Sequence, residues 1–262
     1  ALPGQYFDVD FTRNQLKPTS SLIAVAVHKG HELRPDVDRP MILDKATRLR
    51  EEDPFTGRLA EGLPSWIVVE RSRFEVDLNR DRDSAVYKEP EDSWGLRLWE
   101  THPPDAIVET SLALYDSFYS SLREALDRIV DRHDGFVLFD VHSYNHRRQG
   151  PGEPPESELE NPEVNLGTGS LPEKWKPVSQ AFLDTMNNHG VDARENVKFR
   201  GRQIAQWVHS NYGHVACALA IEFRKSFMDE WTGELFANEF ARLQDLLAKA
   251  GVASVEAWAQ CR

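Results

Sequence analysis

The stretch "GFVLFDVHSYNHRRQGPG", residues 135–152, decides the fold class of this 262-residue chain. Its apolar run ends at Asp140 and His142, and a polar segment with two arginines follows. A continuous apolar run of this length is typical of a strand that is covered on both faces, as in parallel sheets. We therefore interpret residues 135–141 as a central strand that carries an aspartate and a histidine to the edge of a sheet.

Three further segments have the same buried pattern: "SLIAVAV" (21–27), "WIVVE" (66–70) and "VACALAIEF" (215–223). Stretches with helical periodicity, each closed by a glycine, cover 104–135, 171–190 and 233–251. Strands that alternate with helices predict an α/β fold of three layers. The chain length favours a single domain over residues 1–262, in which the irregular stretch 143–172 is either disordered or an active-site loop.

Composition excludes several classes of function. The formal net charge of −12 predicts that nucleic acid is not a partner, although a local basic cluster could bind a small anionic substrate. No apolar run approaches the roughly 20 residues of a membrane helix. Cys217 and Cys261 form neither a disulfide framework nor a metal motif, so we expect a buried Cys217 and a reducing, cytoplasmic location. No glycine-rich phosphate motif follows a strand, which argues against a nucleotide-binding domain.

All four expected strands end in ionisable residues, and ligands of parallel sheets bind at the carboxyl ends of the strands. His28 and His142 would meet at this edge, and neutral imidazole is a common metal ligand. A catalytic zinc site takes three protein ligands and keeps one position open. The spacing His28-x-x-His31 favours His31 as the third ligand. Acidic candidates for the same place are Glu32, Glu51, Glu52 and Asp53.

Two carboxylates at the strand ends have expected roles of different kinds. Asp140 lies two residues before His142, on the same face of the strand, and can accept the outer ring N–H of an imidazole. Glu222 ends an apolar run, and a partly desolvated carboxylate near a metal can take a proton from water. The alternative for Glu222 is a buried salt bridge with Arg73 or Arg224.

Arginines are grouped in two segments that could bind an anion. Arginine holds a carboxylate in a bidentate fork, and asparagine can donate to a carboxylate oxygen. The segment "SRFEVDLNR" contributes Arg73, Asn79 and Arg80, and "KFRGRQ" contributes Arg200 and Arg202.

Taken in order, "VHKGHELRP", "EEDPFTGRL", "SRFEVDLNRDRD", "DVHSYN", "NVKFRGRQI" and "LAIEFRKSFMDEWTG" resemble the motifs of N-formylglutamate amidohydrolases over roughly 21–232. The "DLNR" segment is also similar to that of zinc carboxypeptidases and aspartoacylase, which share a phosphorylase/hydrolase-like α/β fold with a mostly parallel, mixed sheet. The resemblance implies a zinc-dependent hydrolase that cleaves an N-acyl bond to an acidic amino acid.

The resemblance also implies a role for each matching residue. The metal ligands would be His28, Asp53 and His142, with Asp53 now preferred to His31. Zinc carboxypeptidases have a glutamate where this chain has His31, so the two families differ at this position. Glu222 would be the general base and Arg73 a second catalytic residue. The substrate would be bound by Asn79, Arg80, Ser143, Arg200 and Arg202.

Two other functions fit the same residues. A zinc carboxypeptidase or an amidase that acts on a small peptide or a γ-glutamyl compound would also use arginines to hold a carboxylate. A non-catalytic protein that binds a small anion could have the same pocket without turnover. Comparison of formylated amino acids with dipeptides tests the first alternative, and the zinc stoichiometry tests the second.

Overall fold

The computed structural model describes residues 9–262, so residues 1–8 of the expected single domain lie outside the described part. The strands are β1 (Thr12–Gln15), β2 (Leu22–Ala26), β3 (Ser65–Val69), β4 (Phe136–Tyr144), β5 (Val164–Gly167), β6 (Ala193–Glu195) and β7 (Ala216–Arg224). The helices are α1 (Pro35–Asp38), α2 (Lys45–Glu51), α3 (Thr56–Ala60), α4 (Asp105–His133), α5 (Lys176–Asn188), α6 (Gln203–Tyr212) and α7 (Ala237–Gln260). Short 3-10 turns are η1 (Arg82–Ser84), η2 (Pro90–Ser93), η3 (Glu173–Trp175) and η4 (Lys225–Phe227).

The strands form one seven-stranded sheet in the order β1-β3-β2-β4-β7-β5-β6. The four strands expected from the sequence lie side by side at the centre of this sheet and run parallel to one another. Strand β1 is antiparallel to β3, and β5 is antiparallel to β7. The predicted α/β fold with a mixed, mostly parallel sheet is therefore confirmed.

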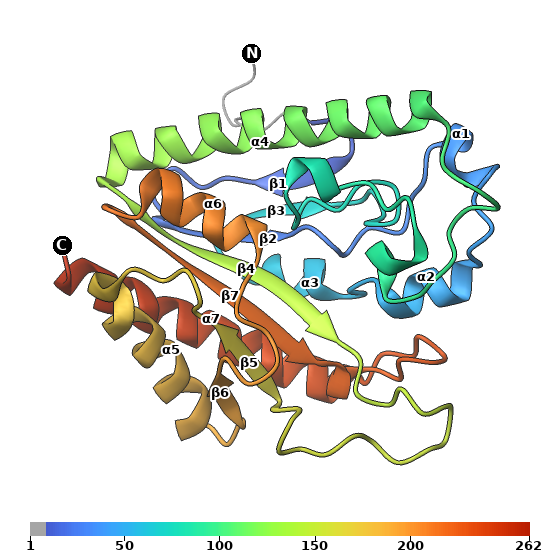
Figure 1. Cartoon of the computed structure of the whole chain (residues 1–262). Helices are drawn as coiled ribbons and strands as arrows, with labels where there is room; N and C mark the ends of the chain where they lie inside the picture. Colours follow the sequence, from blue (N-terminus) through green and yellow to red (C-terminus); the bar gives the residue numbers. More distant parts are fainter. Residues whose placement is uncertain (1–8) are drawn as a thin grey trace.

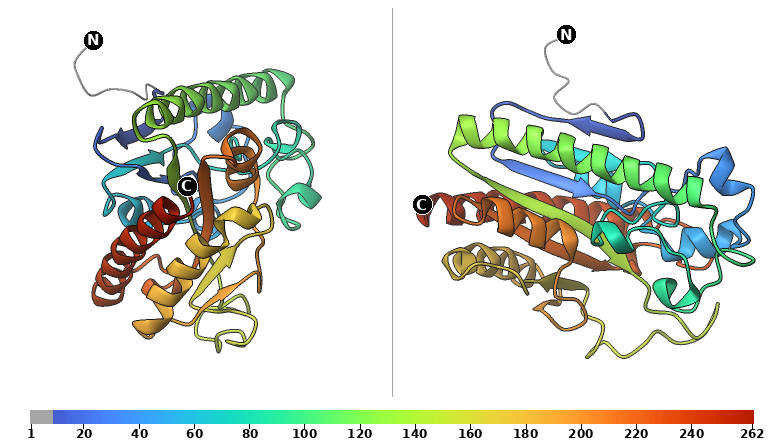
Figure 2. Two further views of the ribbon diagram at one scale, coloured as in Figure 1. Left: turned by 90° about the vertical axis from the view of Figure 1, so that its left-hand side faces the viewer. Right: turned by 45° about the horizontal axis from the view of Figure 1, so that its top comes forward.

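Helices cover both faces of this sheet, which gives the three expected layers (Figures 1 and 2). In β2, Leu22 and Ala24 face a core that includes residues of α3, α5 and α7. The residues between them, Ile23 and Val25, face a second core with α4 and α6. Because side chains alternate across a strand, this two-sided burial explains the unbroken apolar runs of the sequence.

The helix expected over 233–251 has different bounds, because α7 continues through Gly251 to Gln260. Gly251 is not a helix cap: a Cβ atom there would lie 2.7 Å from Cδ2 of Leu22. The missing side chain thus lets α7 pack closely against β2. Cys217 is buried in the core, as expected, and no helix within residues 9–262 is long and apolar enough to span a membrane.

Within 143–172, which we expected to be irregular, the structure has the last two residues of β4 and all of β5. The remaining connection leaves the carboxyl end of β4 as a long excursion (Figure 1). This end of the sheet is also where β2 and β7 deliver their polar residues.

Candidate metal centre and its cavity

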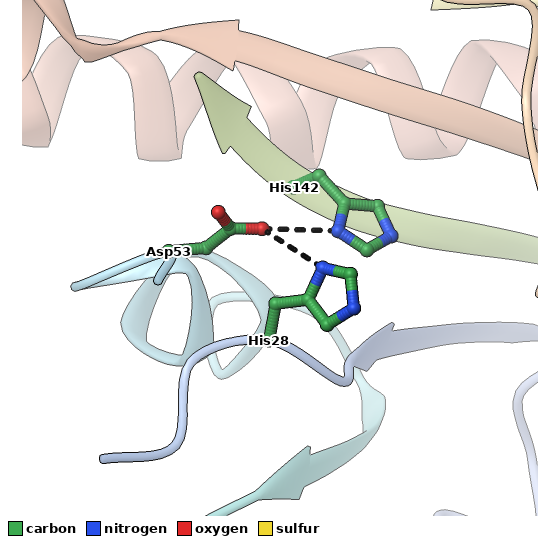
Figure 3. A group of neighbouring side chains, drawn as sticks. All are labelled: His28, Asp53 and His142. Carbon is green, nitrogen blue, oxygen red and sulfur yellow. Dashed lines mark hydrogen bonds and ion pairs between the residues drawn. The ribbon is translucent and has the colours of Figure 1, made fainter. Parts of the chain in front are cut away.

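Three side chains from distant parts of the sequence meet beyond the carboxyl ends of the central strands. His28 follows β2, Asp53 follows α2, and His142 lies in β4; all three are buried. Their potential ligand atoms lie within 4.8 Å of one another. Oδ2 of Asp53 is 3.0 Å from Nδ1 of His142 and 3.6 Å from Nδ1 of His28 (Figure 3). The structure thus brings together the three residues that we expected to hold a metal.

The outer nitrogen of each imidazole is held by a second buried aspartate. Nε2 of His28 lies 2.6 Å from Oδ1 of Asp77, and Nε2 of His142 lies 2.7 Å from Oδ1 of Asp140. When each Nε2–H donates to its carboxylate, each Nδ1 lone pair is free on the side of Asp53. Carboxylates commonly fix metal-binding histidines in this way, so the donor set fits a divalent ion. Asp140 thus contacts His142 as expected from the sequence.

Electrostatics favour positive charge between these side chains. Burial by itself would raise the pKa of Asp53, but hydrogen bonds with His142 and His28 hold it below its ordinary value. Burial would likewise lower the pKa of His142, but Asp140 and Asp53 raise it well above the usual range. In both cases the neighbouring charges outweigh the cost of desolvation.

The alternative third ligands do not join the group of His28, Asp53 and His142. Nδ1 of His31 lies 2.6 Å from Oε2 of Glu52, and the other carboxylate oxygen of Glu52 accepts a hydrogen bond from Ser72. Glu32 is exposed, and Glu51 pairs with Arg50 at 2.9 Å. The spacing that favoured His31 assumed a tight turn. The chain instead runs along the end of β3, where Glu32 forms a bridge with Arg71.

Glu222 lies opposite His142 in the register of β4 and β7, and both line a cavity of about 100 Å³. Burial raises the pKa of Glu222 to about 8, and the carboxylates of Asp53 and Asp140 act in the same direction. Within residues 9–262, Glu222 forms no salt bridge with Arg73 or Arg224. Arg224 instead donates to the carbonyl oxygen of Asn161 at 3.0 Å. Glu222 is therefore a carboxylate directed at the cavity.

Arg73 is fixed in the cavity wall. Its Nη2 donates to Oδ2 of Asp77 at 2.9 Å, and its Nε donates to the hydroxyl of Tyr87 at 3.2 Å. The guanidinium also lies over the ring of Trp94, 4.8 Å from its centre. Among the described residues Nη1 has no partner, so one donor of Arg73 is left for the cavity.

The five expected substrate-binding residues divide into two groups. Asn79, Ser143 and Arg202 line the cavity, whereas Arg80 and Arg200 are not among its lining residues. Arg80 stacks over Tyr87 beside an adjoining hollow, and the side chain of Arg200 is exposed.

The contacts of Asn79 and Ser143 differ in kind. Oδ1 of Asn79 accepts the backbone N–H of Ile204 at 3.0 Å, and its Nδ2 lies 3.1 Å from Nε2 of His142. Because Nε2–H of His142 donates to Asp140, this approach is a packing contact, and Asn79 lies directly beside a candidate metal ligand. Oγ of Ser143 is buried without a partner in the described part of the chain, and can donate to a bound substrate.

Sequence reasoning missed several residues of the cavity, above all Lys225. Its Nζ donates to the carbonyl oxygens of Arg50 (2.6 Å) and Glu52 (2.8 Å) and to Oδ1 of Asn145 (2.8 Å). Burial lowers the pKa of Lys225 to about 8. The lysine ties β7 to the segment just before Asp53. A lysine three residues beyond Glu222, at the end of a buried strand, was the available signal.

The fold and the cavity together define a three-layer α/β protein with a candidate metal centre at the carboxyl ends of its central strands. The model of the family "N-formylglutamate amidohydrolase" matches residues 20–228, and the chain belongs to this family of amidohydrolases. The resemblance seen in the sequence is thereby confirmed.

Solved structures show the same fold. The N-formylglutamate amidohydrolase from Ralstonia eutropha JMP134 superposes with a TM-score of 0.76 at 17% identity, over 94% of this chain and 98% of that chain. The gene product Atu2144 from Agrobacterium tumefaciens has a TM-score of 0.64 at 15% identity, over 96% of this chain and 100% of that chain. A comparison with curated proteins gave no match.

Proposed function

We propose that the protein is a zinc-dependent amidohydrolase that cleaves the N-acyl amide of an acidic amino acid, with N-formylglutamate as the model substrate. The observation that carries the proposal is the buried group of His28, Asp53 and His142 in one cavity with Glu222. Membership of the amidohydrolase family supports amide hydrolysis. The structurally similar protein from Ralstonia eutropha JMP134 is named N-formylglutamate amidohydrolase.

The metal would be held by Nδ1 of His28, Nδ1 of His142 and Oδ2 of Asp53. Two imidazoles and one carboxylate are a donor set that suits zinc and leaves a position open for catalysis. A bound zinc ion would activate water and polarise the acyl carbonyl.

Glu222 and Arg73 would carry out the remaining chemistry. Glu222 would take the proton of the attacking water and return it to the leaving nitrogen. A pKa near 8 leaves both its deprotonated form, which takes the proton, and its protonated form, which returns it, populated near neutral pH. The free Nη1 of Arg73 would donate to the oxygen that becomes negative, an effect commonly worth about 3 kcal/mol per donor. Ser143 and Arg202 would contact the substrate, and Asn79 would line the cavity beside His142.

The test is an assay of the zinc-loaded protein with N-formyl-L-glutamate, other N-acyl amino acids and dipeptides. We expect the acidic N-formyl amino acid to be the preferred substrate. The Glu222→Gln variant should lose on the order of 10²- to 10⁴-fold in kcat while it retains zinc. The matched control is Glu158→Gln, since this side chain on the chain's exterior is 80% exposed. Full activity of the Glu222→Gln variant would show that the mechanism is wrong.

A further inference from the structure

Four cationic side chains line the cavity, and two of them are already committed to other groups. Arg73 donates to Asp77, and Lys225 is buried with three oxygen acceptors. Arg202 forms no side-chain hydrogen bond or ion pair within residues 9–262. Arg148, which sequence reasoning did not identify, is the fourth cation.

The side chain of Arg148 makes only a weak contact with the rest of the protein. Its Nη1 lies 3.7 Å from Oε2 of Glu51, and the side chain is 44% exposed. Glu51 has a closer partner, because Nη1 of Arg50 lies 2.9 Å from its other carboxylate oxygen. An exposed ion pair of this length contributes little to stability. The guanidinium of Arg148 is therefore available at the rim of the cavity.

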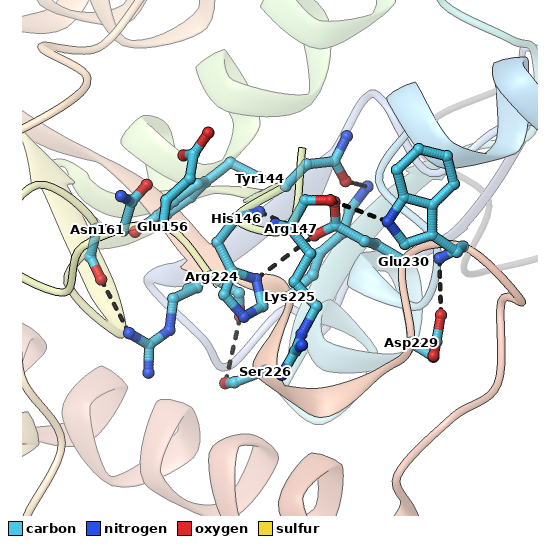
Figure 4. Close-up of polar contacts among 12 residues, drawn as sticks. Tyr144, His146, Arg147, Glu156, Asn161, Arg224, Lys225, Ser226, Asp229 and Glu230 are labelled. Carbon is cyan, nitrogen blue, oxygen red and sulfur yellow. Dashed lines mark hydrogen bonds and ion pairs between the residues drawn. The ribbon is translucent and has the colours of Figure 1, made fainter. Parts of the chain in front are cut away.

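The backbone that carries Arg148 is, by contrast, firmly held. The buried carboxylate of Glu230 accepts the backbone N–H groups of His146 at 2.8 Å and Arg147 at 3.1 Å (Figure 4). The indole N–H of Trp231 donates to the carbonyl oxygen of Arg147 at 2.9 Å. Glu230 and Trp231 thus hold the backbone N–H and the carbonyl oxygen of Arg147, the residue just before Arg148. A fixed backbone reduces the entropy cost when the side chain binds a ligand.

We propose that Arg148 binds the side-chain carboxylate of the substrate and selects acidic over neutral N-acyl amino acids. The inference rests on the proposed function and adds a residue that determines specificity. Arginine suits this role because its planar fork can bind both oxygens of a carboxylate. Arg202, the other uncommitted cation, would bind the second carboxylate of the same molecule.

Calorimetry on the zinc-loaded protein tests the binding step without turnover, with L-glutamate and L-glutamine as probes. The Arg148→Met variant should bind glutamate about 10- to 100-fold more weakly than the parent, because a charge-assisted contact is lost. Its affinity for glutamine should change little. Arg148→Lys should show a smaller loss, since it keeps the charge but not the fork. Arg147→Met is the control in the same loop, because Nη1 of Arg147 donates to the carbonyl oxygen of Glu153 outside the cavity.

Kinetics provide the second readout. With N-formyl-L-glutamate the Arg148→Met variant should show the same fold-increase in KM with little change in kcat, and N-formyl-L-glutamine should show neither change. Equal losses for both substrates, unchanged glutamate affinity, or a parent protein that does not bind glutamate would overturn the inference. If glutamate binds in an Arg148-dependent way but no N-formyl amino acid is cleaved, the inference stands and the proposed function fails.

Discussion

Substitution of Asp140 by asparagine should weaken zinc binding without removing a zinc ligand. Oδ1 of Asp140 lies 2.7 Å from Nε2 of His142, and the side chain is fully buried in β4. The variant keeps the size of the side chain but loses its charge. Loss of a carboxylate behind a metal-binding histidine typically lowers metal affinity about 10- to 100-fold, or roughly 1.4 to 2.7 kcal/mol.

Two effects of the substitution oppose each other. Asp140 attracts the metal, but it also raises the pKa of His142 and so favours a proton that competes for the imidazole. A divalent ion interacts with the carboxylate more strongly than a single proton does, so loss of attraction for the metal dominates. The net effect should therefore be weaker binding, and the difference should be largest where the proton no longer competes, at higher pH.

Competition with a chelator gives the zinc affinity directly. Asp116→Asn is the matched control, because this exposed aspartate pairs with Arg82 on the outer surface of α4. Zinc affinity of Asp140→Asn equal to that of the parent protein would refute the assignment of Asp140 as the residue that orients His142.

Three further predictions follow from other parts of the structure. Asp53→Ala should lose stoichiometric zinc while His31→Ala retains it, as measured by metal analysis; the reverse result would restore His31 as the third ligand. Burial lowers the pKa of His209 from 6.5 to about 4, and its Nε2 accepts the N–H of Ala218 at 3.0 Å. Since the unfolded chain binds this proton first, stability should fall from about pH 6.5 towards about pH 4. Denaturant titrations should show a smaller fall for His209→Gln, and an unchanged pH dependence would contradict this. Gly30→Ala should destabilise the protein by about 1–3 kcal/mol, because its Cβ would lie 2.3 Å from the carbonyl oxygen of Arg71. Thermal denaturation should show a smaller loss for Gly62→Ala, because its Cβ would lie 2.9 Å from the flexible side chain of Gln244 and no closer than 3.2 Å to a backbone atom, the carbonyl oxygen of Leu59.

The centre of the fold could be predicted from the sequence because each central strand carries its own signal. Burial on both faces requires apolar residues throughout the strand. As a result, β4 and β7 each begin within one residue of the expected start. The outer strands carry no such signal. Strand β1 is "TRNQ" and β6 is "ARE", and both are strands because of the backbone pairing with β3 and β5. Short polar segments of this kind cannot be distinguished from loops without their partners.

The site could be predicted where strand ends determine it. His28, His142 and Glu222 follow from the rule that ligands bind at the carboxyl ends of parallel strands. Asp53 lies after a short helix, and no spacing relates it to the histidines, so only the family resemblance favoured it over the other candidates. Lys225 was missed because its partners are backbone carbonyl oxygens of α2 and the residue after it. Such contacts arise from the packing of distant segments and leave no pattern in the sequence.

Under the proposed function, the distribution of charge over the cavity would give a substrate one orientation. At its inner end Asp53 and Glu222 line the cavity beside the imidazoles, and the side chain of Asp53 is only 4% exposed. Arg148, at the rim, is 44% exposed. A dianionic N-acyl amino acid that entered with its carboxylates first would leave Arg148 and Arg202 without anionic partners and keep its acyl amide away from Glu222. In the opposite orientation the acyl amide reaches the imidazoles, and the carboxylates remain beside the cations at the rim. This separation accounts for how a chain with a net charge of −12 could select an anion.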